Sequence, residues 1–253
     1  QTVKSGTLGL CRRAHLCDDW PFVLQRLGSR DVQEPGNTAI SPAREPPRPP
    51  SAARIGLLGG SFNPAHGGHL HISREALRRL ALDEVWWLVS PQNPLKAEHD
   101  MASLADRMRQ ADRVADDRRI RVTDLESRLG TRYTVDTVRV LRRRYPRVRF
   151  VWLIGADNLA QMPQWYNWEA LFRLVPIAVF ARRPYSLRAL TGPAAQRFAR
   201  WRIPRRAARQ LAGKKPPAWV FLDIRAHPAS ATAIREARER AVGPKSGERG
   251  NGV

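Results

Sequence analysis

Short apolar runs alternate with amphipathic stretches along the chain, and this pattern predicts an α/β fold. Apolar runs of strand length occur at residues 54–58, 85–90, 120–123, 150–154, 176–181 and 218–222. Continuous apolar runs are typical of parallel strands, because helices cover both faces of a parallel sheet. Between the runs, apolar residues recur at helical spacing. We therefore expect a parallel sheet of five or six strands with helices on both faces.

Capping residues place the ends of several predicted helices. Ser103 precedes an amphipathic stretch at 104–115, and Asp106 takes the acidic position of a capping box. Thr134 is the predicted N-cap of a helix that carries Val135, Val138 and Leu141 on one face. We expect this second helix to stop before Pro146.

The chain begins with a segment that differs in composition from the rest. Residues 34–51 contain six prolines, which cannot form a helix or a central strand. We predict that residues 1–53 are a disordered or weakly structured extension, that 54–242 form the folded domain, and that 243–253 are a flexible tail. Cys11 and Cys17 fit neither a zinc nor a redox spacing, which favours a reduced, cytoplasmic setting. No apolar run reaches the length of a membrane span, and no signal peptide is evident.

Positive charge dominates the sequence, with 44 Lys and Arg against 23 Asp and Glu and a net charge of +21. Such a balance suits polyanionic ligands, which include both nucleotides and nucleic acids. The charge is carried almost entirely by arginine, in a chain also rich in alanine and proline, so coding bias is an alternative explanation. For the arginine-rich stretch 187–216 we favour a solvated helical insertion over a nucleic-acid surface.

The densest chemistry lies in residues 54–71, RIGLLGGSFNPAHGGHLH. A strand here leads into a turn at Gly59 and Gly60, then a loop, then a helix that opens near Gly67 and Gly68. Backbone N–H groups and a helix N-terminus together form an anion site. His66 and His69 are three residues apart, so both imidazoles can donate to one anion. No third ligand is spaced to complete a metal shell, so a triphosphate fits better than a metal.

The stretch GGSFNPAHGGH resembles the signature of the nucleotidyltransferase superfamily, Gly-x-Phe-(Asp/Asn)-Pro-x-His-x-Gly-His. The resemblance extends over about residues 54–240 and implies a Rossmann-like three-layer α/β/α domain. It also implies that His66, His69 and Lys96 are catalytic. Lys96 follows the 85–90 strand, in a position where the family carries a Pro-x-x-Pro-(His/Leu)-Lys element.

Further elements match one branch of this superfamily, the bacterial nicotinate-mononucleotide adenylyltransferases. The stretch from Tyr133 to Thr137 resembles their Thr-Tyr-x-Thr-(Val/Ile)-Asp-Thr element, and QWY at 164–166 supplies a tryptophan in the place where one packs on the nicotinate ring. The sequence SATAIR resembles their Ile-Ser-Ser-Thr-x-Ile-Arg element, with alanine at 231 in place of one hydroxyl.

The resemblance assigns two groups of binding residues. The ATP group comprises Gly59, Gly60, Ser61, Phe62, His66, Gly68, His69, Gly155, Asp157, Ser230, Thr232 and Arg235. The nicotinate-mononucleotide group comprises Asn63, Lys96, Tyr133, Thr134, Trp165, Tyr166 and Arg183. Which of Arg182 and Arg183 contacts ligand stays open, as does whether Asp157 binds ribose or only caps a helix.

The expected reaction is adenylyl transfer from ATP to nicotinate mononucleotide, which yields deamido-NAD and pyrophosphate. Mg²⁺ is expected to bind through the phosphates of ATP, without a dedicated protein site. The alternatives are a sibling enzyme acting on nicotinamide mononucleotide or phosphopantetheine, and a non-catalytic RNA-binding protein on the same fold. We expect no membrane association and no nucleic-acid partner.

Overall fold

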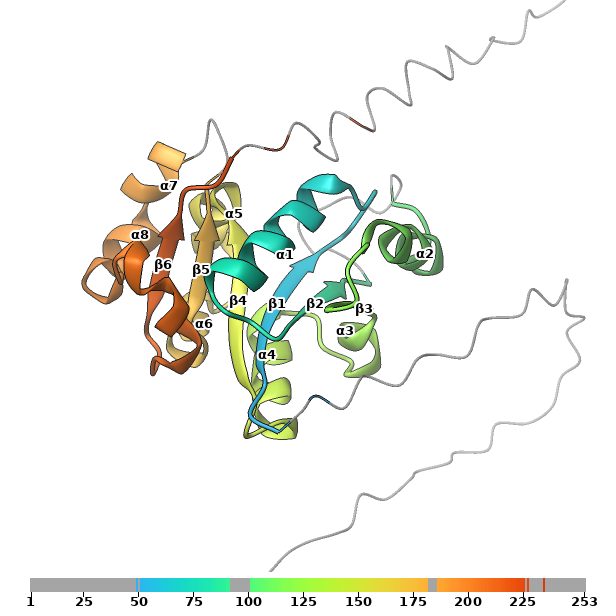
Figure 1. The fold of residues 1–253 in the computed structure, drawn as a ribbon, viewed down its shortest axis with the longest axis horizontal. Coiled ribbons are helices and arrows are strands. Elements are labelled where there is room, and N and C mark those ends of the chain that lie inside the picture. The colour runs from blue at the N-terminus through green and yellow to red at the C-terminus, as the bar shows by residue number, and fades with distance from the viewer. Residues whose placement is uncertain are drawn as a thin grey trace, which may run out of the picture. The chain divides into compact units, whose positions relative to one another are not determined.

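A computed structural model describes residues 49, 51–91, 101–181, 186–225, 227 and 234 (Figure 1). Within these residues the chain builds a sheet of six parallel strands in the order β3-β2-β1-β4-β5-β6. The strands are β1 (Arg54–Gly60), β2 (Glu84–Val89), β3 (Ile120–Thr123), β4 (Arg149–Gly155), β5 (Ile177–Phe180) and β6 (Trp219–Leu222). Each apolar run therefore forms a strand, and the predicted parallel sheet is confirmed.

Helices cover both faces of the sheet, as a three-layer α/β/α fold requires (Figure 1). One face is covered by α1 (Gly67–Arg79), α2 (Leu104–Val114) and the 3₁₀ helix η4 (Arg205–Gly213). The other face is covered by α3 (Leu125–Arg128), α4 (Thr134–Arg144), α5 (Ala156–Gln161), α6 (Trp168–Leu174), α7 (Ser186–Thr191) and α8 (Pro193–Arg197). Two short 3₁₀ turns, η2 (Met162–Gln164) and η3 (Ala199–Trp201), complete the described elements.

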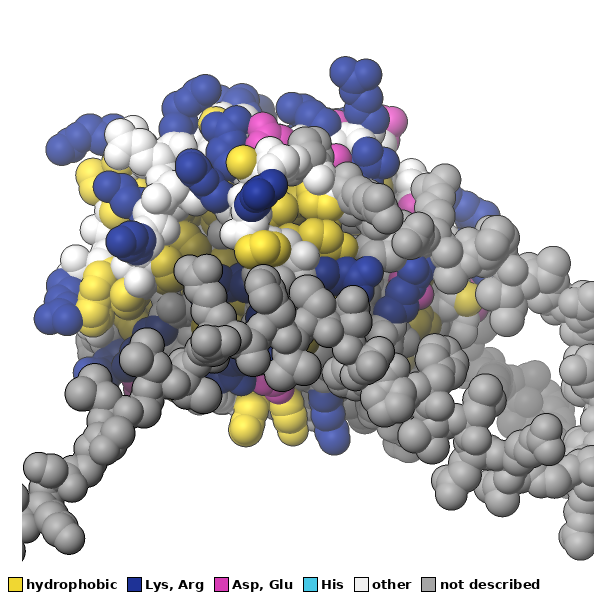
Figure 2. Space-filling model, turned by 90° about the horizontal axis from the view of Figure 1, so that it is seen from below, with side chains coloured by type: hydrophobic (Ala, Val, Ile, Leu, Met, Phe, Trp, Pro, Cys, Tyr) yellow, Lys and Arg dark blue, Asp and Glu magenta, His cyan; other side chains and the backbone are white. Residues whose placement is uncertain are grey.

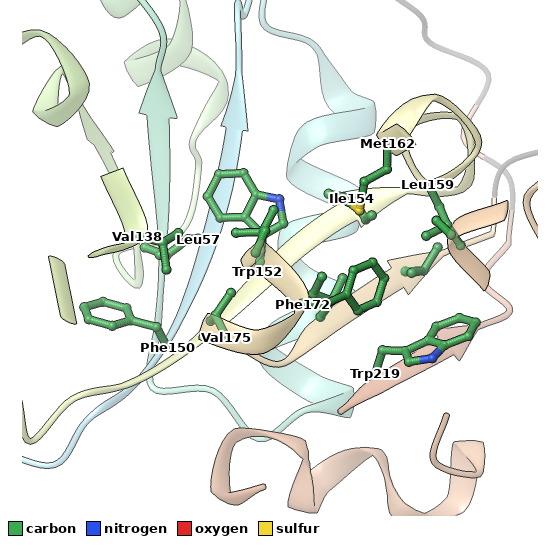
Figure 3. Packing of buried hydrophobic residues seen from close by; sticks show 14 of the residues in the cluster. Leu57, Val138, Phe150, Trp152, Ile154, Leu159, Met162, Phe172, Val175 and Trp219 are labelled. Carbon is green, nitrogen blue, oxygen red and sulfur yellow. The ribbon is translucent and has the colours of Figure 1, made fainter. Parts of the chain in front are cut away.

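The core consists of two apolar layers because successive side chains of a strand point to opposite faces. In β2, Trp86 belongs to the layer beneath α4 and α6, whereas Trp87 belongs to the layer beneath α1 and α2. Both indoles are fully buried. Figure 3 shows the first layer, where Trp152 and Phe172 lie among aliphatic side chains from β1, β4 and the covering helices.

The strand order sets the position of a ligand crevice. From β1 the chain moves to β2 and β3 on one side, and it then returns to place β4 on the other side of β1. In open parallel sheets, ligands bind where the order reverses, beyond the carboxyl ends of the two strands. Residues after Gly60 and after Gly155 flank that reversal point.

Three local predictions are wrong. Gly59 and Gly60 pair with Leu88 and Val89 as the last residues of β1, so they do not form a turn. Packing explains the glycine at position 59, because a Cβ there would lie 2.7 Å from the ring of Trp152. Thr134 is the first residue of α4, and the N-cap is Tyr133, whose side chain makes no capping hydrogen bond.

The third wrong prediction concerns residues 187–216, which are not a solvated insertion. They connect β5 to β6 and contribute to both core layers: Phe198 packs flat on Phe172 with 4.1 Å between ring centroids, and Leu211 is fully buried beside β6. Their arginines lie on the outside, where Arg200 stacks 4.0 Å above the ring of Trp201. Figure 2 shows Lys and Arg side chains scattered over one face of the molecule, with few acidic groups.

Candidate active site

The loop between β1 and α1 forms the rim at the carboxyl end of the sheet. Phe62 adopts a positive φ of 48°, which turns the chain sharply after Ser61. Its ring is buried and stacks on Trp87 at 5.1 Å and on His69 at 4.7 Å between centroids. The loop is thus attached to the core by an aromatic side chain, and the chain is directed into α1 at a fixed angle.

His66 and His69 cap α1 and fix each other's orientation. The Nδ1 atom of His66 accepts from the backbone N–H of Gly68 at 3.0 Å, and Nδ1 of His69 accepts from the N–H of His66 at 3.2 Å. An accepting nitrogen carries no proton, so in both neutral rings the proton lies on Nε2. The ring centroids are 4.0 Å apart. Each ring therefore caps the helix through Nδ1 and carries its proton on Nε2, a different atom, so helix capping does not use the donor group of either imidazole.

The strand after the reversal point brings a second set of groups to the rim. Gly155 ends β4 and is the N-cap of α5, so Asp157 is the second residue of that helix and not its cap. The capping alternative for Asp157 is therefore wrong. Asp157 thus places a carboxylate, a hydrogen-bond acceptor, in the first turn of α5.

The chain that leaves β6 returns to the start of α1. Nε2 of His71 lies 2.8 Å from the carbonyl oxygen of Arg225, and the rings of His71 and His227 are 5.8 Å apart. A Cβ added to Gly67 would lie 2.8 Å from the His227 ring. Arg225 and His227, which follow β6, therefore lie beside the first turns of α1.

Two tyrosines, one just before α4 and one just after η2, form a tilted ring pair. The rings of Tyr133 and Tyr166 are 4.4 Å apart and tilted by 30°, and Tyr166 is 59% exposed. Trp165 follows η2 in extended backbone and packs partly against the core, so the predicted loop position is confirmed. The structure thus brings Tyr133 and Tyr166 together; Trp165 adjoins Tyr166 in sequence, and Thr134 adjoins Tyr133 at the start of α4.

Comparison with known proteins identifies the family. A family model described as Cytidylyltransferase-like matches residues 57–237. A probable nicotinate-nucleotide adenylyltransferase of Parvibaculum lavamentivorans is 52% identical over 183 residues, which cover 72% of this chain and 91% of that protein. One from Cereibacter sphaeroides is 54% identical over 181 residues, which cover 72% and 96%. This chain belongs to the nicotinate-nucleotide adenylyltransferase family.

Solved structures support the fold of this adenylyltransferase. Plasmodium falciparum nicotinic acid mononucleotide adenylyltransferase complexed with NaAD aligns with a TM-score of 0.55 at 17% identity, covering 73% of this chain and 83% of that one. The same enzyme complexed with APC aligns with a TM-score of 0.53. At such identity the likeness concerns the fold alone.

Some predicted site residues of this adenylyltransferase lie outside the described residues. They are Lys96, Arg182, Arg183, Ser230, Thr232 and Arg235. Their roles stay predictions. Within the described ranges, no group of three or more His, Cys, Asp or Glu is arranged to hold a metal ion, and no helix is long and apolar enough to cross a membrane.

Two buried charged residues near the rim escaped prediction. Arg107 on α2 is 1% exposed and donates four hydrogen bonds to backbone carbonyls. Glu126 on α3 is 8% exposed, and burial raises its pKa to about 7. Hydrogen bonds from the hydroxyls of Thr137 and Ser90 lower the pKa and so partly oppose the effect of burial. In the sequence each is one charged residue on an amphipathic helix, and only long-range packing distinguishes it from its neighbours.

Proposed function

We propose that this chain transfers the adenylyl group of ATP to nicotinate mononucleotide, giving deamido-NAD and pyrophosphate, in the biosynthesis of NAD. The observation that carries the proposal is the His66–His69 pair, whose two Nε2–H donors lie at the reversal point of a parallel sheet. Relatives that share about half of their residues with this chain bear the corresponding enzyme name.

The chemistry needs positioning more than proton transfer. The 5′-phosphate of the mononucleotide is already an anionic oxygen nucleophile, so no general base is required. It attacks the α-phosphorus of ATP, the bond from that phosphorus to the bridging oxygen breaks, and pyrophosphate leaves with the electron pair. Catalysis then rests on in-line alignment and on stabilising negative charge. No covalent enzyme intermediate is needed.

The histidines serve the reacting phosphate. Neutral imidazoles with the proton on Nε2 donate hydrogen bonds to the α-phosphate and to the bridging oxygen as charge builds there. The capping bonds at Nδ1 hold both rings in this tautomer before ATP arrives, so no reorganisation is needed during the reaction.

The remaining triphosphate oxygens need further cations and donors. Ser230, Thr232 and Arg235 are proposed to hold the β- and γ-phosphates, and Lys96 to bridge the two substrates. The placement of Arg225 and His227 beside α1 supports this, because Ser230 follows His227 by three residues. Mg²⁺, when bound, neutralises phosphate charge. We propose that the cation enters bound to ATP.

The aromatic group beyond β4 is proposed to select the second substrate. Trp165 offers a flat indole for the pyridine ring, and Tyr133 with Tyr166 forms an adjoining aromatic wall. The open N-terminus of α4, where Thr134 begins the helix, offers N–H groups to a carboxylate.

Two further sets of contacts are proposed. Asn63 and one of Arg182 and Arg183 bind nicotinate mononucleotide. Gly155 and Asp157 bind the ribose of ATP.

The test is pyrophosphate release from ATP by the purified chain across a panel of acceptors. Nicotinate mononucleotide should support release, whereas nicotinamide mononucleotide should be at least about tenfold poorer in kcat/KM, since only the acid carries a carboxylate. Phosphopantetheine should give none. Release with phosphopantetheine alone, or no release with any acceptor together with salt-dependent RNA binding, would replace the proposal by one of its alternatives.

A further inference from the structure

Arg107 is the one arginine among the fully buried side chains of the described part, and its setting is unusual for a cation. Its guanidinium donates from Nε to the carbonyl of Ala102 at 2.9 Å and from Nη2 to that of Pro91 at 3.0 Å. Nη1 donates at 2.7 Å to the carbonyls of both Ser61 and Ser90. All four acceptors are neutral backbone oxygens, and burial lowers the pKa of Arg107 with no carboxylate opposing the shift.

Burying a cation without an anionic partner is costly, so this arrangement calls for an explanation. The four carbonyls belong to three segments: Ser61 follows β1, Ser90 and Pro91 follow β2, and Ala102 precedes α2. A planar guanidinium can hold several acceptors in one fixed geometry. One side chain therefore ties together the backbone that borders the carboxyl edge of β1 and β2.

The bond to Ser61 reaches the proposed phosphate site. In a trans peptide the carbonyl and the following N–H point in opposite directions, so holding the oxygen of Ser61 also fixes the N–H of Phe62. The ring of Phe62 in turn packs against that of His69, with 4.7 Å between their centroids. Among the residues that the structure describes, no carboxylate pairs with Arg107, so its charge adds positive potential at the same rim, and low-dielectric surroundings strengthen that potential.

We propose that Arg107 is a positioning residue for adenylyl transfer. It fixes the β1–α1 loop and makes the electrostatic potential at the rim more positive, which favours binding of the ATP phosphates, without contacting them itself. The inference rests on the proposed function only in that ATP binds at this rim. It adds a requirement that lies outside the signature sequence, because Arg107 follows His69 by 38 residues and belongs to a different helix.

The test compares Arg107→Lys and Arg107→Met with the control Arg113→Met, which removes an exposed arginine from the same helix. Lysine keeps the charge but cannot hydrogen-bond to all four carbonyls, whereas methionine lacks both the charge and the planar set of N–H donors. Three quantities are measured at a temperature where each variant is folded: kcat/KM for ATP, KM for nicotinate mononucleotide, and inhibition by pyrophosphate. Calorimetric binding of a non-hydrolysable ATP analogue provides a readout that does not depend on turnover.

We expect kcat/KM for ATP to fall about tenfold in Arg107→Lys and about a hundredfold in Arg107→Met. Pyrophosphate inhibition and binding of the analogue should weaken in parallel, while KM for the mononucleotide should change less than about threefold. If Arg107→Met does not fold, Arg107→Lys alone decides. A merely structural role would lower the melting temperature but leave ATP and pyrophosphate affinity of the folded protein at the native values, and that result would overturn the proposal. Native protein that binds the analogue without transferring adenylyl groups would refute the proposed function and leave this test intact.

Discussion

The Nδ1 atom of His69 accepts a hydrogen bond from the backbone N–H of His66 at 3.2 Å, while the two rings lie 4.0 Å apart. This relationship joins helix capping to catalysis. The side of each ring that caps the helix is separate from the side that can donate to a ligand. Each histidine can therefore cap the helix through Nδ1 and donate to a ligand through Nε2–H at the same time.

Substitutions of the two histidines should separate these roles. His69→Ala should lower kcat about a hundredfold or more, the scale for losing one charge-stabilising donor. His66→Asn should also lose activity, yet stay within about 0.5 kcal/mol of native stability because its side-chain oxygen can still cap α1. His66→Ala should lose activity and about 1 kcal/mol of stability. Steady-state kinetics and urea unfolding measure both; a near-normal rate in His69→Ala would remove that residue from the mechanism.

Gly59 and Gly60 should respond differently to a methyl group. In Gly59→Ala the new Cβ would lie 2.7 Å from the ring of buried Trp152, and overpacking should cost about 1–3 kcal/mol of unfolding free energy. In Gly60→Ala the nearest atom would be 3.5 Å away, an ordinary contact, so stability should change little. If Gly60 lies against ATP, this second variant should instead raise KM for ATP. Equal loss of stability in the two variants would contradict the packing described for β1.

Glu126 should make stability depend on pH. Its pKa is raised from 4.5 to about 7 in the folded protein, so between these values the folded chain holds a proton that the unfolded chain has released. Stability is therefore greatest below about pH 4.5 with respect to this group and falls as pH rises through about 7. Glu126→Gln, which stays neutral, should be about 1–3 kcal/mol more stable than the native protein at pH 8 and nearly equal at pH 5.

Urea unfolding at the two pH values checks this, with Glu169→Gln on α6 as the control. Glu169 forms an ion pair with Arg173 near the surface at 2.9 Å. Its substitution should change stability by less than about 1 kcal/mol at either pH. A Glu126→Gln variant that is less stable than native protein at pH 8 would show that the buried group is needed as a carboxylate.

The connection between β5 and β6 should behave as core and not as an appendage. Leu211 is fully buried, so Leu211→Ala should cost about 2–4 kcal/mol. The neighbouring Arg209 is exposed, and Arg209→Ala should stay within about 0.5 kcal/mol. Thermal or urea unfolding distinguishes the two. Equal, small effects would restore the interpretation of residues 187–216 as a solvated insertion.

That connection also shows where prediction from sequence fails. The six strands follow from apolar runs, since a strand buried on both faces must be apolar throughout. The 187–216 stretch misleads because it carries seven arginines and most of its apolar residues are alanines, although Phe198 and Leu211 are buried and anchor it to the core. The N-cap of α4 was placed one residue late because a threonine favours capping only where the backbone leaves it outside the helix.

The site residues likewise fall into those that local spacing predicts and those that depend on long-range packing. Local spacing was enough to place His66 and His69 at the start of one helix. Nothing local distinguishes Arg107 from the other arginines of α2, because its burial depends on carbonyls up to 46 residues away. The pairing of Tyr133 with Tyr166, across 33 residues, likewise needs the folded sheet.

The most direct measurement of the central claim follows the phosphorus of ATP. Purified protein is incubated with nicotinate mononucleotide and ATP that carries a radioactive label on the α-phosphorus, and the products are separated by chromatography. The account predicts that the label appears in deamido-NAD and that none is bound covalently to the protein. In the His69→Ala variant the label should reach deamido-NAD about a hundredfold more slowly or worse. Label that remains in ATP, or appears only in AMP or on the protein, would contradict direct adenylyl transfer by this chain.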